Sequence, residues 1–106
     1  MFNVILARSF EKDAKPLLKK YPSLRKELDD LGRILSENPK IGSPLGKDCY
    51  KIRVGIKSKG KGKSGGARVI TYVITDNKEV VLIAIYDKQV KEDLDPNELQ
   101  QLLDRL

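Results

Sequence analysis

Apolar and polar positions alternate most regularly in the middle of the chain. Between residues 49 and 57 apolar side chains occupy every second position, and three of the positions between them are cationic: Lys51, Arg53 and Lys57. A period of two is typical of a strand with one buried face, so the sequence predicts a strand from Cys49 to Lys57. One face of this strand should be apolar and the other cationic.

Two further apolar runs, rich in β-branched residues, follow at Ala67 to Thr75 and Glu79 to Tyr86. Such residues favour strands, and the short Asp76-Asn77 segment between the runs is suited to a turn. The two runs therefore predict a β-hairpin. A short apolar run from Phe2 to Ala7 predicts one more strand near the start of the chain.

A helical spacing of three and four residues appears in three places. It is clearest after Ser23, which can cap a helix, and this helix should end before Pro39 because proline disfavours helical geometry in the preceding residue. An earlier helix, which contains Pro16, is predicted from Phe10 to Lys20. The third helix begins at Asp95, which offers an N-cap followed by proline at the first helical position and glutamate at the third.

The order of these elements is strand, two helices, three strands and a helix, with a loop from Pro39 to Gly46 before the central strands. This order predicts an α+β fold: a small antiparallel sheet with two N-terminal helices packed on one face, and a short C-terminal helix. With 106 residues and no linker-like stretch, the chain is expected to form one domain over residues 1–106.

The net charge of +6 is concentrated in one stretch of the chain. Residues 47–68 contain eight basic residues and one acidic residue, whereas the rest of the chain is nearly balanced. Clustered lysine and arginine favour phosphates because binding releases counterions, so a nucleic acid is expected as partner rather than an acidic protein or a membrane surface. The single Cys49 cannot form an internal disulfide and no signal peptide is expected, which favours a cytoplasmic location.

The composition excludes several kinds of active site. The chain has no histidine, which excludes Ser-His-Asp triads and histidine metal sites. One cysteine cannot form a thiolate zinc site, and the acidic residues lack the spacing of a calcium loop or of paired catalytic carboxylates. No metal or other cofactor is therefore expected. Lysine, arginine and tyrosine can still cleave RNA if its own 2′-hydroxyl group is the nucleophile.

Cations of the alternating strand and of the strand after it are the candidate catalytic residues. Lys51, Arg53 and Lys57 should share one strand face, and Arg68 begins the next strand, so together they could hold a scissile phosphate. Crowded cations make lysine a usable base near neutral pH. The alternative is that these cations form only the solvated face of an exposed strand.

Further lysines are candidates for binding the RNA backbone. Lys59, Lys61 and Lys63 lie in the glycine-rich segment 57–66, and Lys47 precedes the alternating strand. This segment is expected to be a mobile connection that becomes ordered on RNA, or else a flexible solubilising loop. Tyr86 could contact RNA or act as a weaker candidate base, although a core position is the more common role for such a tyrosine.

Three stretches, CYKIRV, GGARVITYV and VVLIAIYDKQVKEDL, resemble the RelE/ParE superfamily of toxins from toxin–antitoxin pairs, and the loop KGKGKSGGAR is most similar to the HigB branch. The resemblance implies a small sheet with two N-terminal helices, cleavage of messenger RNA in the ribosomal A site without a metal, and neutralisation by a cognate antitoxin. No membrane partner is implied.

The resemblance also implies roles for individual residues. Lys51 matches a lysine of the RelE motif, Arg53 stands where RelE has a second lysine, and Arg68 matches the arginine that stabilises the phosphate. Lys88 stands where RelE has an arginine, while Leu94 replaces a tyrosine, which leaves the general base unassigned. Lys51 is then the first choice for the base and Lys57 the second. Two alternatives stay open: a ParE-like inhibitor of DNA gyrase without nuclease activity, and an inactive nucleic-acid-binding module.

Overall fold

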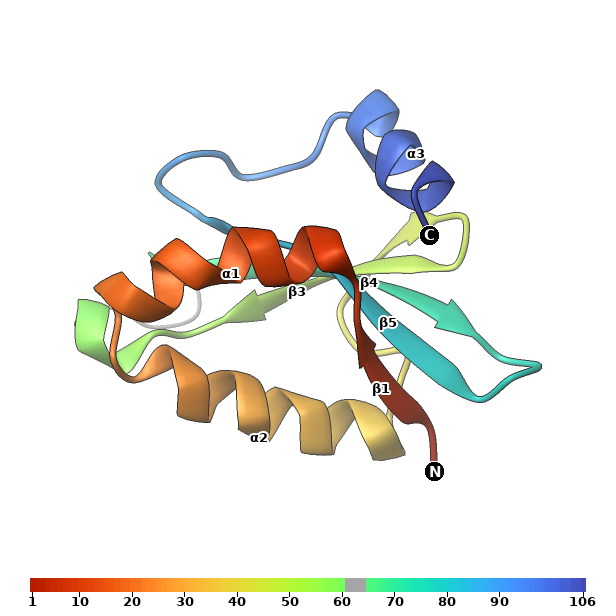
Figure 1. The fold of residues 1–106 in the computed structure, drawn as a ribbon, viewed down its shortest axis with the longest axis horizontal. Helices are drawn as coiled ribbons and strands as arrows, with labels where there is room; N and C mark the ends of the chain where they lie inside the picture. The colour runs from red at the N-terminus through yellow and green to blue at the C-terminus, as the bar shows by residue number, and fades with distance from the viewer. Residues whose placement is uncertain (61–64) are drawn as a thin grey trace.

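The computed structural model describes residues 1–60 and 65–106 and shows an α+β fold built on a five-stranded sheet (Figure 1). The strands lie in the order β1-β5-β4-β3-β2. Their bounds are Asn3–Leu6 for β1, Ser43–Gly46 for β2, Cys49–Val54 for β3, Ala67–Ile74 for β4 and Glu79–Asp87 for β5. The predicted α+β class is confirmed, and β4 and β5 form the predicted hairpin.

The sheet is mixed rather than wholly antiparallel, so the predicted strand directions were wrong at one edge. β1 pairs with β5 in parallel, with Asn3 opposite Glu79, while the other strand pairs are antiparallel. A short apolar run does not indicate whether the strand it pairs with will be parallel or antiparallel. Two parallel strands need a long connection between them, and the residues between β1 and β5 supply one. The edge strand β2 lies within the predicted loop, where its four exposed residues show no alternation.

Helices cover both faces of the sheet. α1 (Arg8–Lys20) and α2 (Leu24–Glu37) lie on one face, where the fully buried Leu24 and Leu35 join the larger apolar cluster. Burial of each leucine stabilises the fold by about 2 kcal/mol. None of the helices in the described ranges is long and apolar enough to cross a membrane.

The second face is covered by α3 (Pro96–Asp104) and by the segment that leads to it from β5. α3 begins with the predicted capping box: Asp95 accepts a hydrogen bond from the Asn97 amide, and Glu98 accepts one from the Asp95 amide. Cys49 is buried on this face, and burial raises the pKa of its thiol to about 11.

The chain leaves the sheet earlier than the alternation predicts. β3 ends at Val54, and the short 3-10 helix η1 (Lys57–Lys59) follows it. Glu27 of α2 accepts a hydrogen bond from the Lys57 amide at 2.8 Å, and the Ser23 hydroxyl accepts one from the Ser58 amide at 3.0 Å. These bonds fix η1 against the first turn of α2, so this part of the predicted mobile connection is anchored to the fold.

Candidate functional site

The strand register places three of the predicted site residues in one row across the sheet. Arg53 of β3 stands opposite Arg68 of β4, and Arg68 stands opposite Tyr86 of β5. Lys51 lies two positions from Arg53 along β3, and side chains two positions apart point to the same face. These residues therefore share the α3 face of the sheet, which brings Lys51, Arg53 and Arg68 of the predicted group to one side of it.

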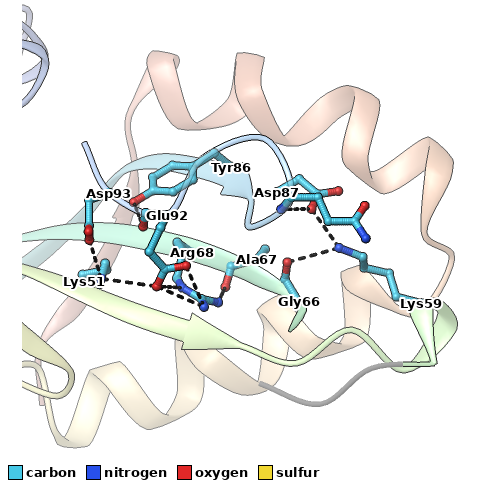
Figure 2. A network of polar contacts seen from close by, with 10 residues as sticks. Lys51, Lys59, Gly66, Ala67, Arg68, Tyr86, Asp87, Glu92 and Asp93 are labelled. Atoms are coloured by element: carbon cyan, nitrogen blue, oxygen red, sulfur yellow. Dashed lines mark hydrogen bonds and ion pairs between the residues drawn. The ribbon is translucent and has the colours of Figure 1, made fainter. Parts of the chain in front are cut away.

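Arg68 is buried, with 1% of its surface exposed, although it begins a strand. Its guanidinium group forms a fork on the carboxylate of Glu92: Nε and Nη2 donate to Oε1 at 3.3 Å, and Nη2 donates to Oε2 at 3.2 Å (Figure 2). Nη1 also donates to the Ala67 carbonyl at 3.2 Å. Because both partners are charged, the fork is stronger than an ordinary hydrogen bond and fixes the orientation of the guanidinium plane.

Glu92 connects Arg68 to two other candidate residues, Lys51 and Tyr86. Lys51 Nζ lies 3.7 Å from Glu92 Oε1 and also forms an ion pair with Asp93, and the Tyr86 hydroxyl donates to the Glu92 carbonyl at 3.1 Å. Partial desolvation raises the pKa of Glu92, but the hydrogen bonds and charge of Arg68, and the charges of Lys51 and Lys88, lower it below its ordinary value. Glu92 is therefore a carboxylate at neutral pH, surrounded by cations.

Tyr86 lies in the core of this face, with 8% of its surface exposed. Burial, together with the nearby carboxylates of Asp93 and Glu92, raises the pKa of Tyr86 to about 12. A phenol with this pKa stays protonated at neutral pH and donates a hydrogen bond, which argues against Tyr86 as a general base. Its burial also leaves little ring surface on which an RNA base could stack.

Three other predicted cations lie at the surface of the protein. Arg53 and Lys88 are exposed, and within residues 1–60 and 65–106 no ion pair joins either of them to an acidic side chain. Lys47 is also exposed, and its ammonium group donates to the side chain of Gln100 on α3. Arg53 and Lys88 can therefore meet an anion from solvent without the loss of an ion pair in this part of the chain.

Lys59 is buried instead of extending into solvent as a phosphate-binding lysine. Its side chain is 4% exposed, and its ammonium forms an ion pair with Asp87 at 2.8 Å and donates to the Gly66 carbonyl at 3.3 Å (Figure 2). The Tyr21 ring lies under the same ammonium at 5.3 Å, and the Tyr21 hydroxyl donates to Asp87. Lys59 therefore joins η1 to the end of β5 within the fold.

The other lysines of the glycine-rich segment 57–66 do not extend the cationic face of β3. Lys57 is exposed but lies in η1, beyond the end of the strand, so the alternation that groups it with Lys51 and Arg53 has ended. Lys61 and Lys63 lie outside the described residues. The candidate site therefore consists of Arg68, Lys51, Arg53 and Lys88, around Glu92.

The acidic members of the site were not predicted from the sequence. Glu92 and Asp93 follow β5 by a few residues and were grouped with scattered acids, because no local spacing links them to Lys51 or Arg68. The available signal was their place after an apolar strand that pairs directly with the strand of Arg68. In the described ranges, no group of three or more His, Cys, Asp or Glu side chains is arranged to hold a metal.

Comparisons with known proteins agree with this fold. A sequence model described as the RelE toxin of the RelE/RelB toxin–antitoxin system matches residues 4–104. A chain of the intact E. coli RelBE toxin–antitoxin complex is similar in structure, with a TM-score of 0.63 and 23% identity, over 82% of this chain and 96% of that one. A mutant of the E. coli toxin RelE in the free state has a TM-score of 0.63 and 18% identity, over 99% of this chain and 97% of that one.

Proposed function

The chain belongs to the family of RelE toxins of RelE/RelB toxin–antitoxin systems, and from this premise we propose that it is an endoribonuclease that cuts messenger RNA on the ribosome and thereby inhibits translation. The observation that supports a nuclease most directly is the convergence of Arg68 and Lys51 on one carboxylate, that of Glu92. Cations arranged around a two-oxygen anion can equally hold the two free oxygens of a phosphodiester.

The proposed roles follow from position and exposure. Arg68 stabilises the charge that develops on the phosphorus oxygens, because its fork geometry matches two oxygens at once. Lys51 supplies a second charge beside it, and the exposed Arg53 and Lys88 bind the flanking phosphates.

The general base stays unassigned in this proposal. Lys51, the first choice for the base, forms ion pairs with Glu92 and Asp93 in the structure. Lys57 lies in η1, beyond the end of β3, which weakens the second choice. Leu94, which stands where RelE has a tyrosine, packs against the apolar cluster under α3 and offers no proton-transfer group.

A cognate antitoxin is the proposed protein partner. A similar chain forms part of the E. coli RelBE toxin–antitoxin complex, and a toxin that blocks translation must be silenced in its own cell. Since this chain has a net charge of +6, an acidic partner segment would be electrostatically complementary to it. We propose that the antitoxin covers the cationic face that contains Lys51 and Arg53.

Primer extension on ribosome-bound messenger RNA tests the nuclease. The wild-type protein should produce new 5′ ends within codons that occupy the A site, whereas naked messenger should be cut much less. A matched sample that contains the Arg68→Ala variant controls for nucleases that co-purify with the protein. The nuclease proposal is wrong if ribosome-bound messenger stays intact with folded wild-type protein at stoichiometric concentration.

The burial of Arg68 is the observation that favours a second candidate. An arginine that is 1% exposed and paired with Glu92 also fits a purely structural ion pair, as expected of a protein that acts by binding, such as a ParE-like inhibitor of DNA gyrase. Inhibition of gyrase supercoiling by the purified protein, without any cut in messenger RNA, would favour this candidate.

A further inference from the structure

RNA cannot reach Arg68 in the observed arrangement. The Arg68 side chain is 1% exposed, whereas the side chain of its partner Glu92 is 40% exposed, so the carboxylate is the solvent-facing member of the pair. A phosphate oxygen must come within about 2.7–3.2 Å of a guanidinium nitrogen to accept a hydrogen bond. Glu92 must therefore leave Arg68 before a phosphate can take its place.

Glu92 binds the same cationic groups that a phosphodiester would bind, the Arg68 guanidinium and the Lys51 ammonium. Its two oxygens accept the fork of Arg68 at 3.2–3.3 Å, and one of them lies 3.7 Å from the Lys51 ammonium. Asp93 binds the same ammonium. Guanidinium and ammonium groups recognise carboxylate and phosphate by the same charge-assisted hydrogen bonds, so the two anions compete for one site.

The segment that contains these acids is held to the sheet mostly by polar contacts and has little apolar packing. Val90 is 78% exposed and the Asp93 side chain 65% exposed, which leaves little apolar packing to hold this part of the chain. Its described contacts with the sheet include the ion pairs of Glu92 and Asp93, the Tyr86 hydrogen bond and partial burial of Leu94. In addition, the Val90 and Lys91 amides donate to the Asp87 carbonyl, and the Lys91 ammonium lies over the Tyr86 ring. Segments with few buried contacts open at low free-energy cost.

We propose that Glu92, assisted by Asp93, is an intramolecular mask of the nuclease site: its carboxylate occupies the phosphate position, and RNA binds by displacing it. The proposal rests on the proposed function, because it treats Arg68 as a phosphate contact. The mask keeps Arg68 paired while no RNA is bound. Because RNA must displace the carboxylate, it binds more weakly than it would to the same site without Glu92. Removing the charge of Glu92 should therefore strengthen RNA binding rather than weaken it.

The test compares two variants that remove the same charge from different places. Glu92→Gln removes the competing anion, while Glu37→Gln removes an exposed carboxylate from the end of α2, on the other side of the sheet. Binding of a fluorescein-labelled single-stranded RNA 12-mer is measured by anisotropy at several salt concentrations with the full chain. Glu92→Gln should bind about tenfold more tightly than wild type, and Glu37→Gln less than twofold.

A second variant covers the case in which Glu92→Gln does not fold. Asp93→Asn removes the more exposed acid beside Lys51, and it should bind the 12-mer at least twofold more tightly than wild type. Urea unfolding checks that each variant is native. Equal affinities of the Glu92→Gln and Glu37→Gln variants, or weaker binding by Glu92→Gln, would overturn the mask and make the Arg68–Glu92 pair structural.

An independent measurement tests masking by Glu92 separately from nuclease activity. Inorganic phosphate is titrated into wild type and Glu92→Gln while the Arg68 Nε–H resonance is followed by NMR. If this resonance responds at a phosphate concentration at least fivefold lower in the variant, the mask stands even if ribosome-bound messenger is not cut. If messenger is cut but neither phosphate nor RNA distinguishes the two proteins, the nuclease stands and the mask is wrong.

Discussion

Arg53 and Arg68 stand directly opposite each other on β3 and β4, yet one is exposed and the other is 1% exposed. Like charges in directly opposed positions of a sheet repel each other. The carboxylate of Glu92 offsets this repulsion at Arg68, while Arg53 faces solvent. The two arginines therefore differ in role although they share one face of the sheet. Arg68 is a fixed, oriented guanidinium group, and Arg53 is an accessible positive charge.

Replacement of Arg68 should affect the cleavage step. If its fork stabilises the transition state, Arg68→Ala should slow cutting of ribosome-bound messenger about a hundredfold, or about 3 kcal/mol in barrier height. Arg68→Lys keeps the charge but loses the fork, and its rate should lie between the two. Single-turnover primer extension measures the rates, and urea unfolding checks the fold. Equal rates for wild type and Arg68→Ala would contradict this role.

Replacement of Arg53 should affect binding more than cleavage. Since Arg53 is exposed, Arg53→Ala should leave the free energy of unfolding within about 0.5 kcal/mol of wild type. If Arg53 binds one phosphate, the slope of log affinity against log salt should fall by about 1. Anisotropy titrations between about 50 and 300 mM salt measure this slope. An unchanged slope would remove Arg53 from the RNA contacts.

Lys59 should matter for stability and not for RNA. Lys59→Met breaks the ion pair with Asp87 and leaves that carboxylate buried without its cation, which should cost about 3 kcal/mol of unfolding free energy. Lys57→Met, which changes an exposed lysine two positions away, should cost less than about 0.5 kcal/mol. Urea unfolding of both variants gives the comparison. A Lys59→Met protein as stable as Lys57→Met would show that the buried pair does not stabilise the fold.

The same ion pair predicts how stability depends on pH. Burial raises the pKa of Asp87, but hydrogen bonds from Lys59, the Gln89 amide and Tyr21 lower it, and the net result is a pKa below its ordinary value. Because the folded-state pKa is the lower one, this stabilisation is complete above the unfolded pKa and is lost as pH falls through the folded one. The difference in unfolding free energy between wild type and Asp87→Asn should therefore shrink as pH falls below about 4. A difference that stays constant down to about pH 2.5 would contradict the lowered pKa.

Much of the fold could be predicted because it depends on local periodicity. The alternation in β3, the hairpin of β4 and β5 and the capping box at Asp95 all follow from neighbouring residues, and the structure contains each of them. The parallel direction of β1 could not be predicted, since it depends on a strand more than seventy residues away in the sequence. β2 was missed because its residues are all exposed and show no alternating pattern.

Within the candidate site, only the residues that the sheet brings close together could be predicted from the sequence. Lys51, Arg53 and Arg68 share a face because the register of two adjacent strands places them there. The positions of Glu92 and Lys59 depend on turns after β5 and β3, and the direction of a chain after a strand ends is set by tertiary contacts. The expected partners of the cations were therefore phosphates, while the structure also provides carboxylates of the chain itself.

The last prediction concerns the nucleophile. The chain has no histidine, and the high pKa of Tyr86 keeps its hydroxyl protonated at neutral pH, so the RNA's own 2′-hydroxyl group is the expected nucleophile. Its attack on the adjacent phosphorus displaces the 5′-oxygen and leaves a 2′,3′-cyclic phosphate and a 5′-hydroxyl end. A 2′-O-methyl group at the scissile nucleotide should therefore abolish cutting.

The control for this prediction is a messenger with the same 2′-O-methyl group one nucleotide further downstream, where it cannot block the reacting hydroxyl. This messenger should be cut at a rate similar to unmodified RNA, and its downstream fragment should accept phosphate from polynucleotide kinase without prior dephosphorylation. Cutting at the blocked nucleotide, or fragments that already have a 5′-phosphate, would mean that water attacks instead. A water nucleophile would also need a base, and the proposed roles of Arg68 and Lys51 in charge stabilisation would be unchanged.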